Sequence, residues 1–247
     1  MAKYQHVLAV GFGADFDPLA GRLLLLSFRA VRVSSTEEAM RTLEHSGEPI
    51  RAALLCVPHR LGDLSFALGR LHEHAPDQSL RFIAVGSRPS PPELKKLRKA
   101  GVEFALWQPF DDAALRFVLN QATHKAGESE SREKLRAPTT MVARVFSQAG
   151  QKAALVYNLS EGGAYLETHR PTAASGHVRV ELPLPTGTVT LDARVVTTNV
   201  TGNVTRSNLP MGMGVEFIAV PNDIRHNLAE YVEALAAAFR IDPRDRD

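Results

Sequence analysis

The first half of the chain alternates short apolar runs with amphipathic stretches. The apolar runs are continuous rather than alternating, as expected of strands in a sheet that helices cover on both faces. They predict strands at 6–10, 30–33, 52–57, 81–86 and 103–108. The stretches between them predict helices at 18–26, 36–45, 65–73, 91–100 and 111–122. Five such repeats predict an α/β doubly wound fold on a parallel five-stranded sheet.

From residue 139 onward the pattern changes to β-branched residues that alternate with polar ones. This alternation predicts strands at 139–147, 152–158, 163–167, 177–182, 188–200 and 212–220, with turn residues between them. Six short strands with one apolar face predict an antiparallel six-stranded β-barrel, because closure removes exposed edges. Apolar positions three and four apart predict a C-terminal helix to about residue 239. We expect this helix to cap the barrel, with dimerisation as the alternative.

Between the two patterns lies a polar stretch without apolar periodicity, at residues 123–137. Its composition is typical of a linker. The predicted organisation is therefore a first domain at 1–122, a linker at 123–137 and a barrel domain at 138–247. A length of 247 residues also favours two domains over one.

Composition narrows the classes of protein that the chain can belong to. With 44% hydrophobic and 23% charged residues it is typical of a globular protein. The longest apolar run is too short to span a membrane, and no signal peptide is evident. Cys56 is the single cysteine, which excludes an internal disulfide and favours the cytoplasm. A net charge of +2 and the lack of a basic helix make nucleic-acid binding unlikely, while an anionic small ligand remains compatible.

The last strand and helix of the first domain carry a recognisable sequence. Residues 99–111 read Lys-Ala-Gly-Val-Glu-Phe-Ala-Leu-Trp-Gln-Pro-Phe-Asp, which resembles the segment ending in Lys-Pro-Phe of response-regulator receiver domains. The resemblance covers about residues 5–122. It implies a receiver-like fold, and it implies contact with a protein partner or homodimerisation through the surface at 95–117. Trp107 on that surface is either exposed for such contact or part of the core, and we favour the core.

The residues that phosphorylation of a receiver requires are absent. The family has paired acidic residues after the first strand, an acceptor Asp ending the third, a Ser or Thr ending the fourth, and a Lys ending the fifth. Here residues 10–12 are Val-Gly-Phe, and the other positions hold Cys56, Gly86 and Gln108. Mg²⁺ needs carboxylate oxygens, which these positions do not provide. Without the metal and the Lys, these positions hold no cation to neutralise the charge on a transferring phosphoryl group. We therefore predict a pseudo-receiver that cannot be phosphorylated.

Two minor alternatives concern residues near these positions. Asp15 and Asp17 are candidates for displaced metal ligands, although Asp17 before Pro18 is equally well explained as a helix N-cap. Cys56 is a candidate redox sensor, although a lone cysteine on a buried strand is more often an apolar filler.

The second half resembles the PilZ domain, over about residues 131–240. Arg132-x-x-x-Arg136 precedes the first strand, Asn158-x-Ser160-x-x-Gly163 forms a turn about 20 residues later, and Gly-Val-Glu-Phe at 214–217 resembles the family's closing strand. An Arg often precedes the first Arg in this family, whereas this chain has Ser131. The resemblance implies that the five residues of the two motifs bind cyclic di-GMP, with no metal and no other cofactor.

The residue types suit this ligand. A planar guanidinium matches the O6/N7 edge of guanine, stacks on a purine and pairs with phosphate. Asn158 and Ser160 offer an amide and a hydroxyl for a guanine edge or for fixing the turn itself. Gly163 permits a positive φ or the close approach of a ligand. An ordinary β-turn remains the alternative for this motif.

The predicted function is therefore that of a non-enzymatic, bacterial, cyclic di-GMP-binding effector. Ligand binding at the linker is expected to reorient the receiver-like domain and so regulate motility, pili, polysaccharide or gene expression. We find no catalytic constellation, and His59, His72 and His74 are not spaced as a metal site. The alternative is a scaffold for protein contacts that works without the ligand. Arg144, Arg179 and Arg194 on predicted strands are minor candidates for phosphate contacts.

Overall fold

In this computed structural model the described residues are 4–14, 16–59, 61–75, 79–124, 135–204 and 206–241. They form two compact units. The first contains the described residues up to 124 together with 239–241, and the second contains residues 135–238. Residues 239–241, which the sequence pattern groups with the barrel, belong to the first unit.

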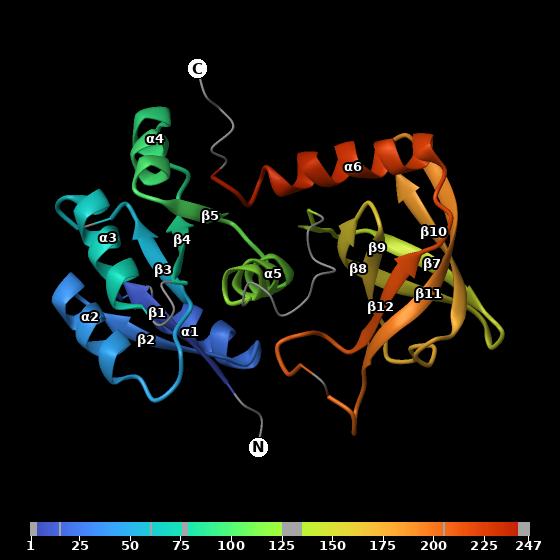
Figure 1. The fold of residues 1–247 in the computed structure, drawn as a ribbon, viewed down its shortest axis with the longest axis horizontal. Helices are drawn as coiled ribbons and strands as arrows, with labels where there is room; N and C mark the ends of the chain where they lie inside the picture. Colours follow the sequence, from blue (N-terminus) through green and yellow to red (C-terminus); the bar gives the residue numbers. More distant parts are fainter. Residues whose placement is uncertain are drawn as a thin grey trace. The chain divides into compact units, whose positions relative to one another are not determined.

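The first unit is a parallel five-stranded sheet with helices on both faces. The strand order is β2-β1-β3-β4-β5, as expected of a doubly wound fold. The strands are β1 (Gln5–Val10), β2 (Phe28–Val33), β3 (Ala52–Val57), β4 (Arg81–Gly86) and β5 (Val102–Trp107). The helices are α1 (Phe16–Leu25), α2 (Thr36–His45), α3 (Leu64–His74), α4 (Pro91–Lys99) and α5 (Asp112–Ala122). Figure 1 shows α2, α3 and α4 on one face of the sheet and α1 and α5 on the other. The predicted fold of this half is confirmed.

Side-chain caps fix where several of these helices begin. Ser35 accepts a hydrogen bond from the Glu38 amide at the start of α2, and Asp111 accepts one from the Ala114 amide at the start of α5. Such caps satisfy backbone donors that the first turn of a helix leaves unpaired. The central strands are almost wholly buried between the helices, which explains their continuous apolar sequence.

The outer edge of β5 is paired with residues from the far end of the described chain. Arg240 lies opposite Phe104 in an antiparallel bridge. The Ala105 amide donates to the Phe239 carbonyl at 3.0 Å, and the Ile241 amide donates to the Glu103 carbonyl at 2.9 Å. The predicted helix to residue 239 is therefore too long, because α6 (Asn222–Ala236) ends earlier. After this helix the chain becomes extended at the sheet edge.

The second unit is a closed antiparallel barrel, as predicted. Its strands run β8-β7-β10-β11-β12-β9, and pairing of β8 with β9 closes the barrel. The six strands are β7 (Val142–Ser147), β8 (Gly150–Ser160), β9 (Gly163–Glu167), β10 (His177–Leu184), β11 (Gly187–Asn199) and β12 (Gly212–Phe217). Alternate residues of these strands fill the core, as the burial pattern of β10 illustrates.

The predicted strand at 139–147 begins later in the structure, as β7 at Val142. A two-residue strand, β6 (Ala137–Pro138), pairs with the end of β8 before β7 begins. Between them the Thr139 hydroxyl donates to the Val156 carbonyl at 2.6 Å, and the Val156 amide donates to the Met141 carbonyl at 2.8 Å. These bonds satisfy the backbone of β8 across the gap, so β6 stays attached to the barrel wall.

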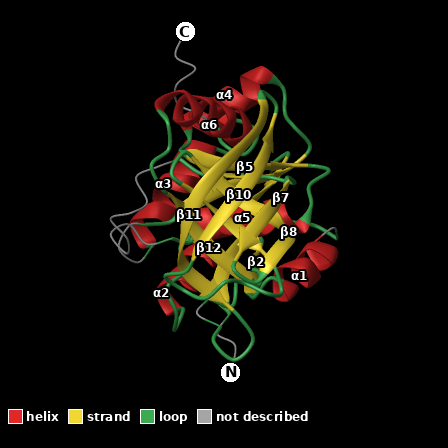
Figure 2. Ribbon diagram, turned by 90° about the vertical axis from the view of Figure 1, so that its right-hand side faces the viewer, coloured by secondary structure: helices red, strands yellow, loops and turns green. Residues whose placement is uncertain are grey.

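Helix α6 lies across one end of the barrel (Figure 2). Its buried residues Leu228, Val232 and Ala236 belong to the barrel core, which confirms the predicted capping role. The helix contacts β6 and β8. Throughout the described residues, no helix combines the length and the hydrophobicity that crossing a bilayer would require.

Candidate functional site

Arg136 and Asn158 are brought together at the start of the barrel. The Nη1 group of Arg136 donates to Oδ1 of Asn158 at 3.2 Å. Arg136 is half-buried, and the Asn158 side chain is buried, with 8% of the residue exposed. Burial lowers the pKa of the Arg136 guanidinium from its ordinary value, because removing water disfavours the charged form. Two residues 22 positions apart, taken from the two predicted motifs, thus share one location.

A β-bulge in β8 directs Asn158 toward Arg136. The register of β8 with β9 shifts between Val156 and Asn158, so β8 carries an extra residue there. The β8 residues in the barrel core are Ala154, Val156 and Leu159, so the spacing of core positions changes from two to three. Without the bulge, Asn158 would continue the core-facing series. Bulges commonly re-aim a side chain in this way.

Two residues that the sequence analysis did not assign to the site flank Asn158. Pro138 pairs with Asn158 from β6, and Tyr165 pairs with it from β9. The Tyr165 hydroxyl donates to the Pro210 carbonyl at 2.7 Å. The position of Tyr165, two residues after Gly163, is the signal that could have identified it, because strand alternation repeats every second residue.

Ser160 and Gly163 fix the turn that follows Asn158. The buried Ser160 hydroxyl donates to the Gly163 carbonyl at 3.0 Å. Gly163 does not have a positive φ. Its missing side chain leaves room for β12 instead, because a Cβ would lie 2.3 Å from the Val215 carbonyl oxygen. Both residues therefore have a structural role, and their contact with a ligand stays a prediction. Arg132, the remaining predicted site residue, lies outside the described residues.

Arg136 differs from three other arginines of the barrel in its partners. Arg144 pairs with Glu181, Arg179 with Asp192 and Arg194 with Glu216, each across neighbouring strands. Among the described residues, no carboxylate forms an ion pair with Arg136. Arg144, Arg179 and Arg194 stay minor candidates for phosphate contacts, although each already has a cross-strand carboxylate partner.

A comparison with protein families adds to this geometry. The sequence matches the model of the PilZ domain over residues 130–234. The match includes both predicted motifs and all six barrel strands. Residues 130–234 form a PilZ domain.

Solved structures resemble each half of the chain separately. The PilZ domain of YcgR from Escherichia coli, solved with c-di-GMP, is 18% identical, with 44% of this chain and 93% of that chain covered and a TM-score of 0.35. The receiver domain of a sensor histidine kinase from Pseudomonas aeruginosa is 20% identical, with coverages of 48% and 97% and a TM-score of 0.42. The inhibitor of motility MotI from Bacillus subtilis is 15% identical, with 48% of this chain and 55% of that protein covered and a TM-score of 0.37. No curated protein sequence matches the chain.

A groove elsewhere on the PilZ barrel is a less suitable site for an anion. It has a volume of about 790 Å³ and is lined by residues that include His177, Arg179 and Asp192. None of the predicted site residues lines it. The cation that it offers, Arg179, is already paired with Asp192 at 3.2 Å. The location at Arg136 and Asn158 suits an anion better, because no described carboxylate is paired with the Arg136 guanidinium.

The described strand ends of the receiver-like unit lack the side chains that receiver domains use for phosphorylation. β1 ends at Val10 and is followed by Gly11, while Cys56 and Gly86 occupy the corresponding positions of β3 and β4. Gly86 has a φ of +148°, and a Cβ there would lie 2.1 Å from the carbonyl oxygen of Val57. A Ser or Thr side chain thus does not fit where a receiver needs one.

The structure tests some of the alternative roles that the sequence leaves open for residues of this unit. Asp17 lies in the first turn of α1, which begins at Phe16, so its interpretation as an N-cap is wrong. Asp15 lies outside the described residues. Cys56 is half-buried, and its redox role stays untested. Trp107 packs against the core of this unit, in agreement with the favoured interpretation.

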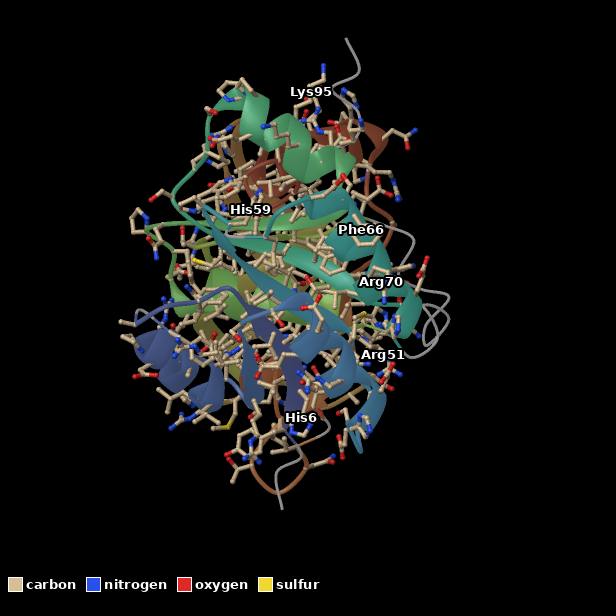
Figure 3. All side chains as sticks on the ribbon, turned by 90° about the vertical axis from the view of Figure 1, so that its left-hand side faces the viewer. His6, Arg51, His59, Phe66, Arg70 and Lys95 are labelled. Atoms are coloured by element: carbon tan, nitrogen blue, oxygen red, sulfur yellow. The ribbon has the colours of Figure 1, made fainter. Side chains whose placement is uncertain are left out.

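The histidines do not form a metal site in the described part of the chain. His59 is labelled in Figure 3, and its Nδ1 lies 3.0 Å from the Leu61 carbonyl oxygen. His74 contacts the carbonyl of Arg70 one helical turn earlier. No group of three His, Cys, Asp or Glu side chains within the described ranges is arranged to hold a metal ion.

Proposed function

We propose that the PilZ unit binds cyclic di-GMP at Arg136 and Asn158, and that the protein is a non-enzymatic bacterial effector of this nucleotide. The observation that carries the proposal is the environment of Arg136. Its guanidinium is half-buried, hydrogen-bonded to a neutral amide, and without an ion pair to a described carboxylate. A partly desolvated and uncompensated cation favours an anionic partner.

The chemistry of the nucleotide fits this cation. Cyclic di-GMP has two phosphodiester anions and two guanine edges with O6 and N7 acceptors. Arg136 uses one donor on Asn158, and a guanidinium has five. Asn158 therefore orients the guanidinium plane while other N–H groups face the ligand. An arriving phosphate or guanine edge stabilises the charged form and offsets the cost of desolvation.

Arg132 is proposed to supply a second guanidinium, one that closes over the ligand from the segment between the two units. Asn158, Ser160 and Gly163 are proposed to form the opposite wall, where the turn of β8 and β9 presents an amide and backbone groups. Arg136 directly precedes β6, whose neighbours include β8 and α6. Ligand binding at Arg136 is thus expected to affect the first strand of the barrel and its capping helix.

The receiver-like unit is proposed to be the output of the effector. Its strand ends lack the groups for phosphoryl transfer, so a change in its orientation or in its partner contacts is the response that remains. The resemblance to PilZ proteins suggests control of motility, pili, polysaccharide or gene expression in the cytoplasm. The cyclic di-GMP of the YcgR structure and the motility role in the name of MotI accord with this range.

A second candidate function is a scaffold that binds proteins without the nucleotide. The structural roles of Ser160 and Gly163 favour it, because the turn motif would be retained for barrel stability alone. This candidate predicts no heat and no stabilisation when the nucleotide is added.

Calorimetric titration of cyclic di-GMP tests the proposal. The wild type is expected to bind, and Arg136→Ala is expected to weaken binding about 5- to 150-fold, as for loss of a bidentate contact of ~1–3 kcal/mol. The Arg132→Ala/Arg136→Ala double variant is expected to lose measurable binding.

Arg179→Ala is the matched control, since it removes a guanidinium from the same barrel that is already paired with Asp192. Its affinity should stay within about twofold of the wild type. Absence of binding by the wild type would argue for the scaffold instead. Equal losses in Arg136→Ala and Arg179→Ala would show that the nucleotide does not bind at Arg136.

A further inference from the structure

The two edges of the receiver-like sheet are protected in different ways. The edge strand β2 exposes Arg29 and Arg32, and charged side chains of this kind discourage pairing with another strand. The opposite edge strand, β5, exposes only Glu103 among its first five residues and is otherwise apolar. Such an edge is open to pairing with any extended segment unless something covers it.

The described chain itself covers this edge. Residues 239–241 run antiparallel to β5 and use the outward-facing carbonyl of Glu103 and amide of Ala105. In Figure 1 this segment follows α6 and lies beside β5. The Ile241 side chain is 4% exposed and belongs to the apolar core that also contains Leu97 of α4 and Val102 of β5. Backbone pairing provides the affinity and a buried side chain provides the specificity, as in other cases of strand addition.

We propose that the outer edge of β5 is a docking site for the extended segment 239–241, and that a second copy of the chain can fill it with the same segment. The contacts that the described residues make here are few, two backbone hydrogen bonds and one buried isoleucine, so the segment is releasable. A second copy offers identical contacts, because the segment and the edge both occur in every chain. Exchange of an identical element between copies is a low-cost route to a dimer.

The chain's own segment 239–241 competes with the same segment of a second copy for the β5 edge, and this competition determines when the segments are exchanged between copies. The segment reaches β5 as part of the same molecule, so its effective concentration there is high, and the edge is filled internally in dilute solution. Exchange becomes important when the protein is concentrated or when the internal segment is weakened. The site thus accepts one kind of partner, an extended strand that places an apolar side chain at the position of Ile241.

Amide hydrogen exchange in the full chain tests internal docking. The Ala105 amide is bonded to Phe239, whereas strand alternation points the neighbouring amides 104 and 106 toward β4. Ile241→Asp is expected to speed exchange at Ala105 by about tenfold or more and to leave residues 104 and 106 protected. Leu25→Asp, at an 80% exposed position of the same unit, is the control and should change none of them. Unchanged exchange at Ala105 in Ile241→Asp would overturn the proposal.

A labelled peptide with the sequence of residues 235–241 tests docking from a second molecule. In fluorescence anisotropy it is expected to bind the full-length Ile241→Asp chain at least about tenfold more tightly than the wild type, whose edge is filled. The same peptide carrying the Ile241→Asp change should bind neither. Equal binding to both chains, or to neither, would refute the docking site. No nucleotide is present in either experiment, so its failure leaves the proposed function untouched.

Discussion

The strand ends of the receiver-like unit and the start of the PilZ barrel differ in what their key positions do. In the first unit, Gly86 stands where a receiver carries a hydroxyl, and neighbouring backbone fills the space that a side chain would need. In the barrel, Arg136 forms no ion pair with a described carboxylate and donates a hydrogen bond to Asn158. Both units retain the fold that their sequences predict. Polar side chains meet at Arg136 and Asn158 in the barrel, whereas backbone fills the space at Gly86, so a fold by itself is no guide to where the chemistry lies.

Placing the hydroxyl of a receiver at residue 86 tests whether backbone excludes a side chain there. Gly86→Ser is expected to lower the free energy of unfolding by roughly 2–5 kcal/mol, because the new Cβ meets the Val57 carbonyl and φ is +148°. Trp107, the single tryptophan, reports on this unit in denaturation followed by fluorescence.

Gly69→Ala in α3 is the matched control for this change. A Cβ there has nothing within 4 Å, and the substitution is expected to raise stability by ~0.5–1 kcal/mol. If Gly86→Ser were as stable as the wild type, the backbone would not be what excludes the receiver hydroxyl.

A substitution at Gly163, the glycine of the barrel motif, tests the role of the barrel turn. Gly163→Ala is expected to cost about 1–3 kcal/mol of barrel stability, because its Cβ meets the Val215 carbonyl oxygen. The loss should appear in circular dichroism of the sheet and leave the unfolding monitored at Trp107 unchanged. A variant that keeps full stability but loses the nucleotide would instead assign Gly163 to the ligand alone.

A smaller effect is expected at the neighbouring hydroxyl. Ser160→Ala removes a buried bond to the Gly163 carbonyl and should cost ~0.5–1.5 kcal/mol. Ser147→Ala removes a similar but exposed bond to the Gly150 carbonyl and should change stability by less than about 0.5 kcal/mol. Equal stability of the two variants would show that the turn after Asn158 does not depend on this bond.

The smallest expected effect is none. Acetyl phosphate with Mg²⁺ should add no phosphoryl group to the wild type or to Cys56→Asp, because residues 10–12 at the end of β1, Val-Gly-Phe, hold no carboxylate for the metal. Mass spectrometry checks this, with an ordinary receiver domain as the positive control. A phosphorylated product from the wild type would show that the strand ends of the receiver-like unit are chemically active, contrary to the comparison with the barrel.

Element types were predictable because each depends on a local pattern. The five repeats of the first unit follow from buried strands that alternate with amphipathic helices, and the six barrel strands follow from alternation and turn residues. Predicted bounds were within one residue at the capped starts of α2 and α5 and less accurate elsewhere. α1, for example, begins at Phe16 rather than at Pro18.

The remaining features depend on contacts between distant residues. The gap between β6 and β7 arises from the bond of Thr139 to Val156, and the orientation of Asn158 arises from a bulge opposite β9. Neither leaves a pattern in the local sequence. The carboxylate partners of Arg144, Arg179 and Arg194 depend on strand register, which the sequence alone does not specify. The meeting of Arg136 with Asn158 was anticipated only because two motifs of one family occurred in order.

The position of the segment 239–241 in the chain affects folding during synthesis on the ribosome. The receiver-like unit is translated first, yet the strand that completes its sheet follows the whole of residues 129–238. Domains generally fold from the N-terminus as they emerge. The β5 edge of the nascent first unit is thus unpaired while the barrel is synthesised. During that interval it is exposed to neighbouring chains that are translated from the same messenger RNA.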